Sequence, residues 1–261
     1  MEKFDIIIQG GQSNAEGYGL GEVTKAYFPS NKIFDLEVEK NVSIVEGKGV
    51  VVDYPNQPFM VKVAEERKSG ENVLGDFSLT FARSYVEHGF LAEGRKLLVI
   101  RSAIGGTGFQ KKHWGLNDPL YQKMLEMTAY ALSLNPENRV VGFLWHQGEH
   151  DAVEGNTAEN YQKQLEDMIS DVREKFGNMP FVAGDFVNEW KTQNLKICEP
   201  IVNAIKNAVK TSGNAAFVET ADLPSNNQKT GNGDPLHFSR EALHILGERY
   251  FENFSKLYCK E

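Results

Sequence analysis

Short runs of apolar residues alternate with longer stretches of helical periodicity along most of the chain. Five runs have the length of strands: Phe4–Gln9, Lys96–Ser102, Arg139–His146, Pro180–Phe186 and Ala215–Glu219. Apolar positions recur at helical spacing over Phe77–Glu93, Leu116–Leu134, Thr157–Phe176, Pro200–Ser212 and Ser239–Tyr258. This alternation is typical of a parallel sheet with helices on both faces. The pattern therefore predicts an α/β fold around a mostly parallel sheet of about five strands.

Three residues mark expected helix starts. Thr157 can cap the helix over Thr157–Phe176, because its hydroxyl can accept a hydrogen bond from the first turn. Ser239 can cap the last helix in the same way. Pro200 is tolerated as the first residue of its helix, where the missing N–H costs nothing.

Residues 18–75 depart from the alternation. Ile33–Val38 and Val50–Val52 have the apolar character of short strands, and Glu46–Gly49 lies between them as the turn of a small hairpin. We interpret the segment as an insertion over the strand ends of a single domain spanning residues 1–261. It either lines the substrate cleft or is a surface excursion, and the sequence does not decide between the two.

Composition restricts the partners and the compartment. The 261 residues carry a formal net charge of −8, which disfavours a nucleic-acid or anionic-membrane partner, because both require a basic surface. Cys198 and Cys259 have no metal-ligand spacing and are not expected to form a structural disulfide. No secretory signal is visible, and no apolar run approaches the ~18 residues of a membrane span. We expect a soluble, cytoplasmic protein.

Polar clusters lie at the carboxyl ends of the predicted strands, where an open parallel sheet binds its ligands. Three of them follow strands, and the fourth precedes the last helix. They are Gln12-Ser13-Asn14, Ile104-Gly105-Gly106-Thr107-Gly108, His146-Gln147-Gly148-Glu149-His150-Asp151 and Asp234-Pro235-Leu236-His237. Because these positions share one rim of the sheet, we expect the clusters to form one site.

Ser13 and His237 are the candidate nucleophile and base. A hydroxyl is a weak nucleophile near neutral pH, and a histidine oriented by a carboxylate activates it. Asp234 lies three residues before His237 and can fold back towards the imidazole. The alternatives are a helix cap for Ser13 and an Asp-Pro turn for Asp234. The sequence around Ser13 is not the G-x-S-x-G elbow, because Ala15 occupies the position of the second glycine.

Two other clusters contain candidate oxyanion donors. Gly105 and Gly106 can lend a main-chain N–H in a serine esterase, although two glycines also fit a tight turn or a phosphate cradle. Gln147 can add a side-chain amide aimed at the same oxygen. A metal site around Gln147 is disfavoured, because it stands where the glutamate of H-E-x-x-H belongs. We therefore expect no metal and no other cofactor.

Together the clusters resemble the SGNH-hydrolase superfamily, and within it the group of sialate O-acetylesterases and carbohydrate esterase family 6 acetyl xylan esterases. Gly11-Gln12-Ser13-Asn14 resembles the first block of that group, and Gly105-Gly106-Thr107 is similar to its second block. His146-Gln147-Gly148-Glu149 with Asp151 is similar to the H-Q-G-E-x-D block, and Asp234-x-x-His237 to the last. The blocks run from residue 11 to 239, so the resemblance covers nearly the whole chain.

The resemblance implies a three-layer α/β/α fold of flavodoxin-like character and metal-free deacetylation of sugar hydroxyls. It implies that Ser13 attacks the acetyl carbonyl, that His237 takes its proton and that Asp234 orients the imidazole. Glu149 is the alternative acid, because in this group the glutamate of the third block competes with the aspartate of the last block. We rank Asp234 first.

The resemblance also implies an oxyanion hole. Its donors would be the N–H groups of Ser13 and of Gly106 or Gly105, together with the side chain of Gln147. Ala15 stands where a methionine often follows in this group, and this departure can alter the acyl pocket.

Four aromatic residues could offer stacking faces to a sugar ring: Tyr18, Trp114, Trp145 and Trp190. Aromatic side chains are more often part of the core. Only Trp114, in the polar loop Lys111–Gly115, is expected to be exposed.

We predict a serine esterase that removes O-acetyl groups from a carbohydrate through an acetyl-enzyme intermediate. Acetylated xylo-oligosaccharides and O-acetyl sialic acids are the candidate substrates. One alternative is an SGNH lipid or thioester hydrolase, which a strongly apolar acyl channel would favour. Another is a catalytically silent carbohydrate-binding protein. The sequence does not predict the oligomeric state.

Overall fold

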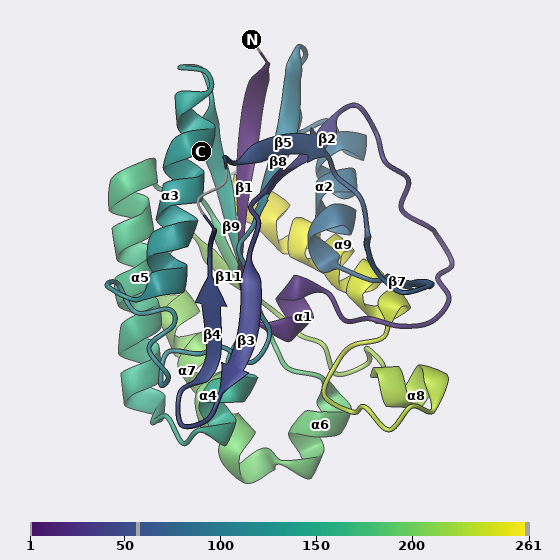
Figure 1. Cartoon of the computed structure of the whole chain (residues 1–261), viewed down its shortest axis with the longest axis vertical. Helices are drawn as coiled ribbons and strands as arrows, with labels where there is room; N and C mark the ends of the chain where they lie inside the picture. The colour runs from purple at the N-terminus through teal and green to yellow at the C-terminus, as the bar shows by residue number, and fades with distance from the viewer. Residues whose placement is uncertain (1, 56–57, 259–261) are drawn as a thin grey trace.

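A seven-stranded sheet forms the centre of the computed structural model, which describes residues 2–55 and 58–258 (Figure 1). The strand order is β11-β10-β9-β1-β8-β2-β5, and every neighbouring pair is parallel except the antiparallel pair β2–β5. The strands are β1 Lys3–Gly11, β2 Ile33–Glu37, β5 Met60–Val63, β8 Arg95–Arg101, β9 Arg139–His146, β10 Phe181–Gly184 and β11 Ala215–Val218. The predicted mostly parallel sheet is confirmed, and two strands from the insertion extend it.

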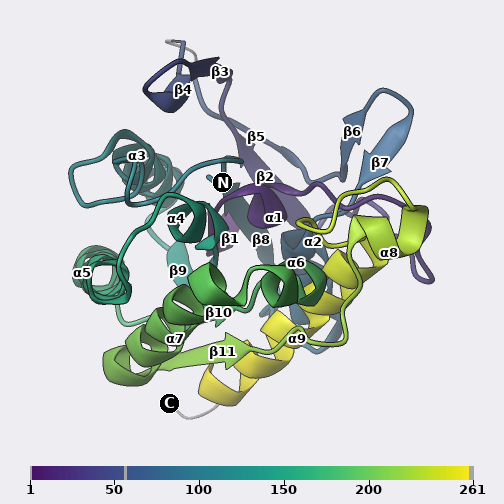
Figure 2. The same ribbon diagram turned by 90° about the horizontal axis from the view of Figure 1, so that it is seen from below.

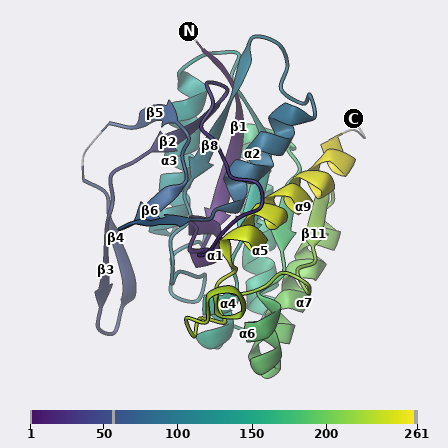
Figure 3. The same ribbon diagram turned by 90° about the vertical axis from the view of Figure 1, so that its right-hand side faces the viewer.

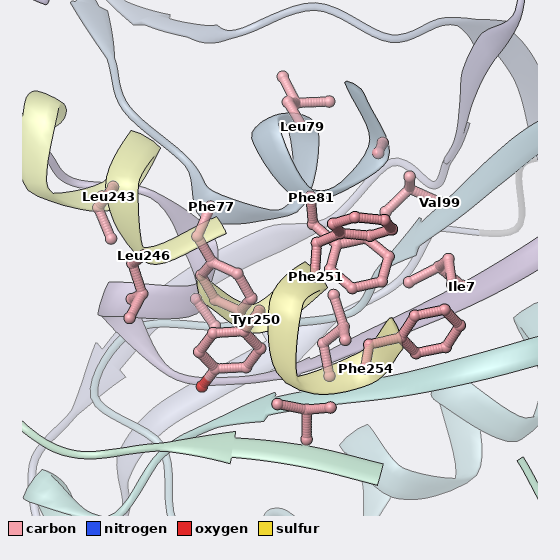
Figure 4. Packing of buried hydrophobic residues seen from close by; sticks show 14 of the residues in the cluster. Ile7, Phe77, Leu79, Phe81, Val99, Leu243, Leu246, Tyr250, Phe251 and Phe254 are labelled. Atoms are coloured by element: carbon pink, nitrogen blue, oxygen red, sulfur yellow. The ribbon is translucent and has the colours of Figure 1, made fainter. Parts of the chain in front are cut away.

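Helices cover both faces of the sheet, as predicted (Figure 2). On one face lie α2 Phe77–Glu87 and α9 Arg240–Tyr258, and on the other lie α3 Pro119–Ser133, α5 Ala158–Phe176 and α7 Leu195–Ser212. Side chains alternate along β1, so Ile7 packs among the aromatic residues of α2 and α9, whereas Ile6 and Ile8 face the opposite layer (Figure 4). The fold is therefore the three-layer arrangement that the sequence predicts.

The helix ends agree with the sequence at two positions and differ at a third. The Thr157 hydroxyl accepts a hydrogen bond from the N–H of Asn160, and the Ser239 hydroxyl accepts one from the N–H of Ala242. The prediction that Pro200 begins its helix is wrong, because α7 starts at Leu195 and contains the proline. Buried Cys198 lies before the proline, so the apolar face of the helix extends beyond it and outweighs one missing hydrogen bond.

The insertion forms two hairpins, β3 Asn41–Val45 with β4 Gly49–Asp53 and β6 Arg67–Ser69 with β7 Asn72–Leu74. The hairpin of β3 and β4 stands on the side of the molecule away from α7 and α9 (Figure 3). The interpretation that Ile33–Val38 pairs with Val50–Val52 is wrong. Ile33 and Leu36 are buried along the edge of β8, and this burial draws β2 into the main sheet.

Two remaining observations concern the expected compartment and the cysteines. Among the residues that the structure describes, no helix combines the length and the apolar character needed to cross a membrane. Cys198 is buried and unpaired, and Cys259 lies outside the described residues.

Candidate active site

The loop after β1 carries Ser13 at a sharp turn. Gly11 has a φ of +133°, and a Cβ there would collide with the main-chain oxygen of His146, so glycine allows the ends of β1 and β9 to meet. Ser13 is the first residue of the short helix α1, Ser13–Glu16, and Gln12 occupies the N-cap position. The hydroxyl of Ser13 therefore does not act as a helix cap.

Ser13 and His237 line the same cavity of about 460 Å³ at the carboxyl ends of the central strands. The other lining residues are Gln12, Tyr18, Val42, Ile44, Val50, Gly105, Gly106, Glu149, His150, Val153, Trp190 and Leu236. Residues of all four clusters and of the hairpin of β3 and β4 thus line the cavity.

Asp234 contacts the imidazole of His237. Its Oδ2 accepts the hydrogen bond from Nδ1 of His237 at 2.8 Å and a second one from Asn226 at 3.0 Å. Its Oδ1 accepts from the N–H groups of Leu236 and His237, so the carboxylate also forms the turn that we considered as an alternative. Burial alone would raise the pKa of Asp234, but the hydrogen bonds from Asn226 and His237 hold it below its ordinary value.

Tyr18 covers one face of the His237 ring. The two rings are stacked with centroids 5.2 Å apart and an interplanar angle of 20°. With Asp234 at Nδ1 and Tyr18 on its face, the imidazole has little freedom to rotate, and Nε2 remains available for another partner. The composition of the chain gave no signal for this contact, since Tyr18 was only one of several candidate aromatic residues.

Asn14 connects the first cluster with the third and the last, a role that the sequence did not reveal. Its Nδ2 donates to Oε1 of Glu149 at 2.9 Å and to the main-chain oxygen of Leu236 at 3.2 Å. Its Oδ1 accepts from the N–H of Phe238 at 3.0 Å. Asn14 is completely buried. It therefore fixes the loop that carries His237 beside the loop that carries Ser13.

Glu149 contacts Asn14 and lies beside His146. Its Oε1 is 3.9 Å from Nε2 of His146, and both side chains are buried. Burial raises the pKa of Glu149 to about 7 and lowers the pKa of His146 to about 3. The structure thus places Asp234, and not Glu149, against His237.

The contacts of Gln147 do not support its expected role as an oxyanion donor. Its Nε2 donates to Oε1 of Gln12 at 3.1 Å, to the main-chain oxygen of Thr107 at 3.1 Å and to Oδ2 of Asp151 at 2.7 Å. Both amide hydrogens are therefore engaged beneath the cavity.

Gln12 presents the better oriented amide. The N–H of His150 donates to Oε1 of Gln12 at 3.1 Å, and because a main-chain N–H can only donate, this contact identifies the oxygen end of the amide. Nε2 of Gln12 has no acceptor in the described part of the chain, and the side chain lines the cavity beside Ser13. Its position directly before the serine was the only sequence signal.

Gly105 and Gly106 also differ in whether their N–H groups already have an acceptor. The N–H of Gly105 donates to Oε2 of Glu16 at 2.7 Å, so it is engaged and cannot serve as an oxyanion donor. Within residues 2–55 and 58–258, the N–H groups of Gly106 and Ser13 have no acceptor, and both residues line the cavity. Gly106 has a φ of +69°, which favours glycine at this turn.

Two of the four candidate aromatic residues line the cavity, but the one that was expected to be exposed does not. Trp114 is completely buried and donates to the hydroxyl of Thr107, so the expectation that it is exposed is wrong. Lys111 and Lys112 misled the prediction, because these two residues are exposed while the indole packs against Trp145. Tyr18 and Trp190 instead line the cavity.

The third cluster does not have the geometry of a metal centre in the described part of the chain. Nδ1 of His146 is 3.0 Å from the Tyr250 hydroxyl. Asp151 accepts from the N–H groups of Phe109 and Gln110 and from Gln147. These groups hold the loop after β8 beside the loop after β9.

A family model described as carbohydrate esterase, sialic acid-specific acetylesterase matches residues 3–256. A probable 9-O-acetyl-N-acetylneuraminic acid deacetylase of Escherichia coli is 25% identical over 155 residues, which span 50% of this chain and only 47% of that protein. A probable carbohydrate esterase of Arabidopsis thaliana is 24% identical over 95% of this chain and 91% of its own length. The crystal structure of NanS superimposes with a TM-score of 0.74 at 19% identity, covering 100% of this chain and 99% of that one.

Proposed function

Because this chain belongs to the carbohydrate esterase family of sialic acid-specific acetylesterases, we propose that it removes O-acetyl groups from a carbohydrate through an acetyl-enzyme on Ser13. The family that the four clusters predict is thereby confirmed. Membership supports ester hydrolysis, and the arrangement of the cavity supports the roles given below.

Ser13 is the proposed nucleophile and His237 the proposed base. Nδ1 of His237 donates to Asp234, which leaves Nε2 as the atom that takes the proton of the Ser13 hydroxyl. As Oγ of Ser13 bonds to the acetyl carbon, the carbonyl oxygen becomes negative. The intermediate then collapses and its bond between the acetyl carbon and the sugar oxygen breaks. The sugar oxygen takes the proton from His237 and leaves, and the acetyl group remains esterified to Ser13. Water completes the second half-reaction with His237 as base.

The proposed oxyanion hole comprises the N–H groups of Ser13 and Gly106 and Nε2 of Gln12. All three donors lack an acceptor in the part of the chain that the structure describes, and their residues share the cavity. Such donors cost no reorganisation when charge develops, and each typically lowers the barrier by about 3–4 kcal/mol. Gln147 acts in this scheme through Gln12, whose oxygen it holds.

The observation that carries the proposal is the convergence of Ser13 with the His237–Asp234 pair in one cavity. The test is hydrolysis of p-nitrophenyl acetate by the wild-type protein and by Ser13→Ala. We expect loss of turnover and of the initial burst of p-nitrophenol in the variant. Ser170→Ala, an exposed position on α5, is the matched control and should retain both. Equal rates for wild type and Ser13→Ala would exclude Ser13 as the nucleophile.

The apolar rim of the cavity favours a second candidate, an esterase for longer acyl chains. Ile44 is 86% exposed and Val153 is 60% exposed, and both border the cavity that contains Ser13. A series of p-nitrophenyl esters from acetate to octanoate separates the two functions. The proposed acetylesterase should prefer acetate, and a preference for octanoate would identify the second candidate.

Acetylated xylo-oligosaccharides and O-acetyl sialic acids remain the proposed substrates. The protein itself is proposed to be a single domain that acts in the cytoplasm. Acetate release from both classes, measured side by side, identifies the sugar.

A further inference from the structure

The carboxylate of Glu16 lies where the serine loop, the glycine loop and the insertion meet. Glu16 is the last residue of α1, three positions after Ser13. Its Oε2 accepts the hydrogen bond from the N–H of Gly105 at 2.7 Å. The next residue along the chain is Gly106, whose N–H borders the cavity. The position of this donor therefore depends on the contact between Glu16 and Gly105.

Two cations from the insertion hold the carboxylate. Nη1 of Arg67 lies 3.0 Å from Oε1 of Glu16 and donates at 2.8 Å to the main-chain oxygen of the same residue. Nζ of Lys40 lies 3.4 Å from Oε1. The side chain of Glu16 is only 8% exposed, whereas those of Lys40 and Arg67 are 27% and 38% exposed, so water screens the three charges in part. We call these three residues the Glu16 ion cluster.

The charge of the cluster suits an oxyanion nearby. A lone carboxylate beside the Gly105–Gly106 loop would repel the negative charge that develops on the carbonyl oxygen. Lys40 and Arg67 bring the sum of formal charges to +1, which favours that oxygen instead. The insertion therefore supplies the compensation that lets an acidic side chain orient the loop.

The Glu16 ion cluster also contacts Tyr18, the residue that stacks on His237. The hydroxyl of Tyr18 lies 3.5 Å from Oε2 of Glu16, and the ring of Tyr18 stacks on His237. The guanidinium of Arg67 lies 6.0 Å from the centroid of the same ring. The residues that hold the glycine loop thus also touch the ring that covers the imidazole.

We propose that Glu16 is a positioning residue for the oxyanion hole, held in place by Arg67 and Lys40, and that residues 18–75 are in this way part of the catalytic apparatus. This inference rests on the proposed function of Ser13. Glu16 does not touch the reacting atoms, and acts by fixing Gly105 and hence the N–H of Gly106.

The test compares Glu16→Ala, which removes the acceptor of the Gly105 N–H, and Arg67→Met with the control Glu65→Ala in steady-state hydrolysis of p-nitrophenyl acetate. Glu65 is an exposed acid of the same insertion that lines the same charged depression as Glu16. We expect kcat to fall on the order of 10- to 100-fold in both test variants, with KM changed less than about twofold, since the loss concerns the transition state. Glu65→Ala should match wild type.

Binding of methaneboronic acid distinguishes positioning from a general structural effect. It forms a tetrahedral anionic adduct on a nucleophilic serine, and its affinity should fall by the same factor as kcat in both test variants. Unchanged kcat in either test variant, or lowered kcat with unchanged boronate affinity, would overturn the proposal. Failure of the proposed function is distinguishable, because Ser13→Ala would then keep the activity of wild type.

Discussion

Nδ1 of His237 lies 2.8 Å from Oδ2 of Asp234, within a single loop that enters α9. The aspartate also accepts the N–H of His237, so one carboxylate fixes both the main chain and the ring of the same residue. This double contact holds Nδ1 as the protonated nitrogen and leaves Nε2 free for proton transfer.

We expect Asp234→Asn to lower kcat for p-nitrophenyl acetate about 1,000-fold or more, because the amide removes the charge that stabilises the imidazolium. Glu149→Gln should lower it less than about tenfold, since Glu149 contacts Asn14 and His146 and not His237. Steady-state kinetics on the two variants checks the ranking. A larger loss in Glu149→Gln would make Glu149 the acidic partner.

The buried pair of Glu149 and His146 predicts how stability depends on pH. The pKa of Glu149 is raised to about 7, so its contribution is present below the pKa of the unfolded chain and is lost as pH rises through 7. The pKa of His146 is lowered to about 3, so its contribution is present above the unfolded value and is lost as pH falls. The two groups therefore favour a maximum of the unfolding free energy between pH 3 and pH 7.

Glu149→Gln should remove the decline on the alkaline side. A raised pKa of this size corresponds to about 3 kcal/mol of unfolding free energy lost between pH 4.5 and 8. Urea unfolding at pH 5 and pH 8 measures it. Relative to the change in wild type, Glu149→Gln should gain about 2–3 kcal/mol of unfolding free energy from pH 5 to pH 8. Glu174→Gln, at an exposed position on α5, should show the wild-type change. The wild-type change in both variants would mean that Glu149 is not a buried neutral acid.

The two glutamine amides should separate catalysis from stability. Gln12→Glu removes the Nε2 donor but keeps the oxygen that accepts from His150 and Gln147, so it should lower kcat by ~100- to 1,000-fold with little change in Tm. Gln147→Ala removes one buried donor from Asp151 and one from the oxygen of Gln12, so it should lower Tm by several degrees. Kinetics and thermal unfolding on both variants test this. Normal kcat in Gln12→Glu would assign the oxyanion to the main-chain donors alone.

The sequence predicted which loops meet at the site. The prediction of the oxyanion donor failed, because it depends on the direction in which a single side chain points. Strand periodicity placed Ser13 and Gly106 on one rim, because parallel strands of a single sheet end together. It could not show whether Gln12 or Gln147 turns its amide into the cavity, since both residues follow a strand end. That choice depends on the N–H of His150, a contact between loops far apart in the chain.

Long-range pairing and burial explain the other errors. The apolar residues Ile33–Val38 suit any strand edge, and only the assembled sheet provides β8 as their neighbour. Trp114 lies in a polar loop, yet its ring belongs to the buried cluster that also contains Tyr121 and Trp145, so burial overrides its flanks. The link between Glu16 and Arg67 crosses the boundary of the insertion and leaves no local pattern.

The hairpin of β3 and β4 should determine how the cavity holds the sugar. Ile44 is 86% exposed in the free protein, and covering such a side chain with substrate is worth about 1.5–3 kcal/mol at most. Ile44→Ser should therefore raise KM for an acetylated oligosaccharide about tenfold and leave kcat nearly unchanged, because an aliphatic side chain takes no part in the proton transfers. Met60→Ser, at an exposed position on β5 that does not line the cavity, is the control. If Ile44→Ser instead impairs hydrolysis of p-nitrophenyl octanoate and not of the oligosaccharide, the hairpin holds an acyl chain, and the enzyme is an esterase of the second class.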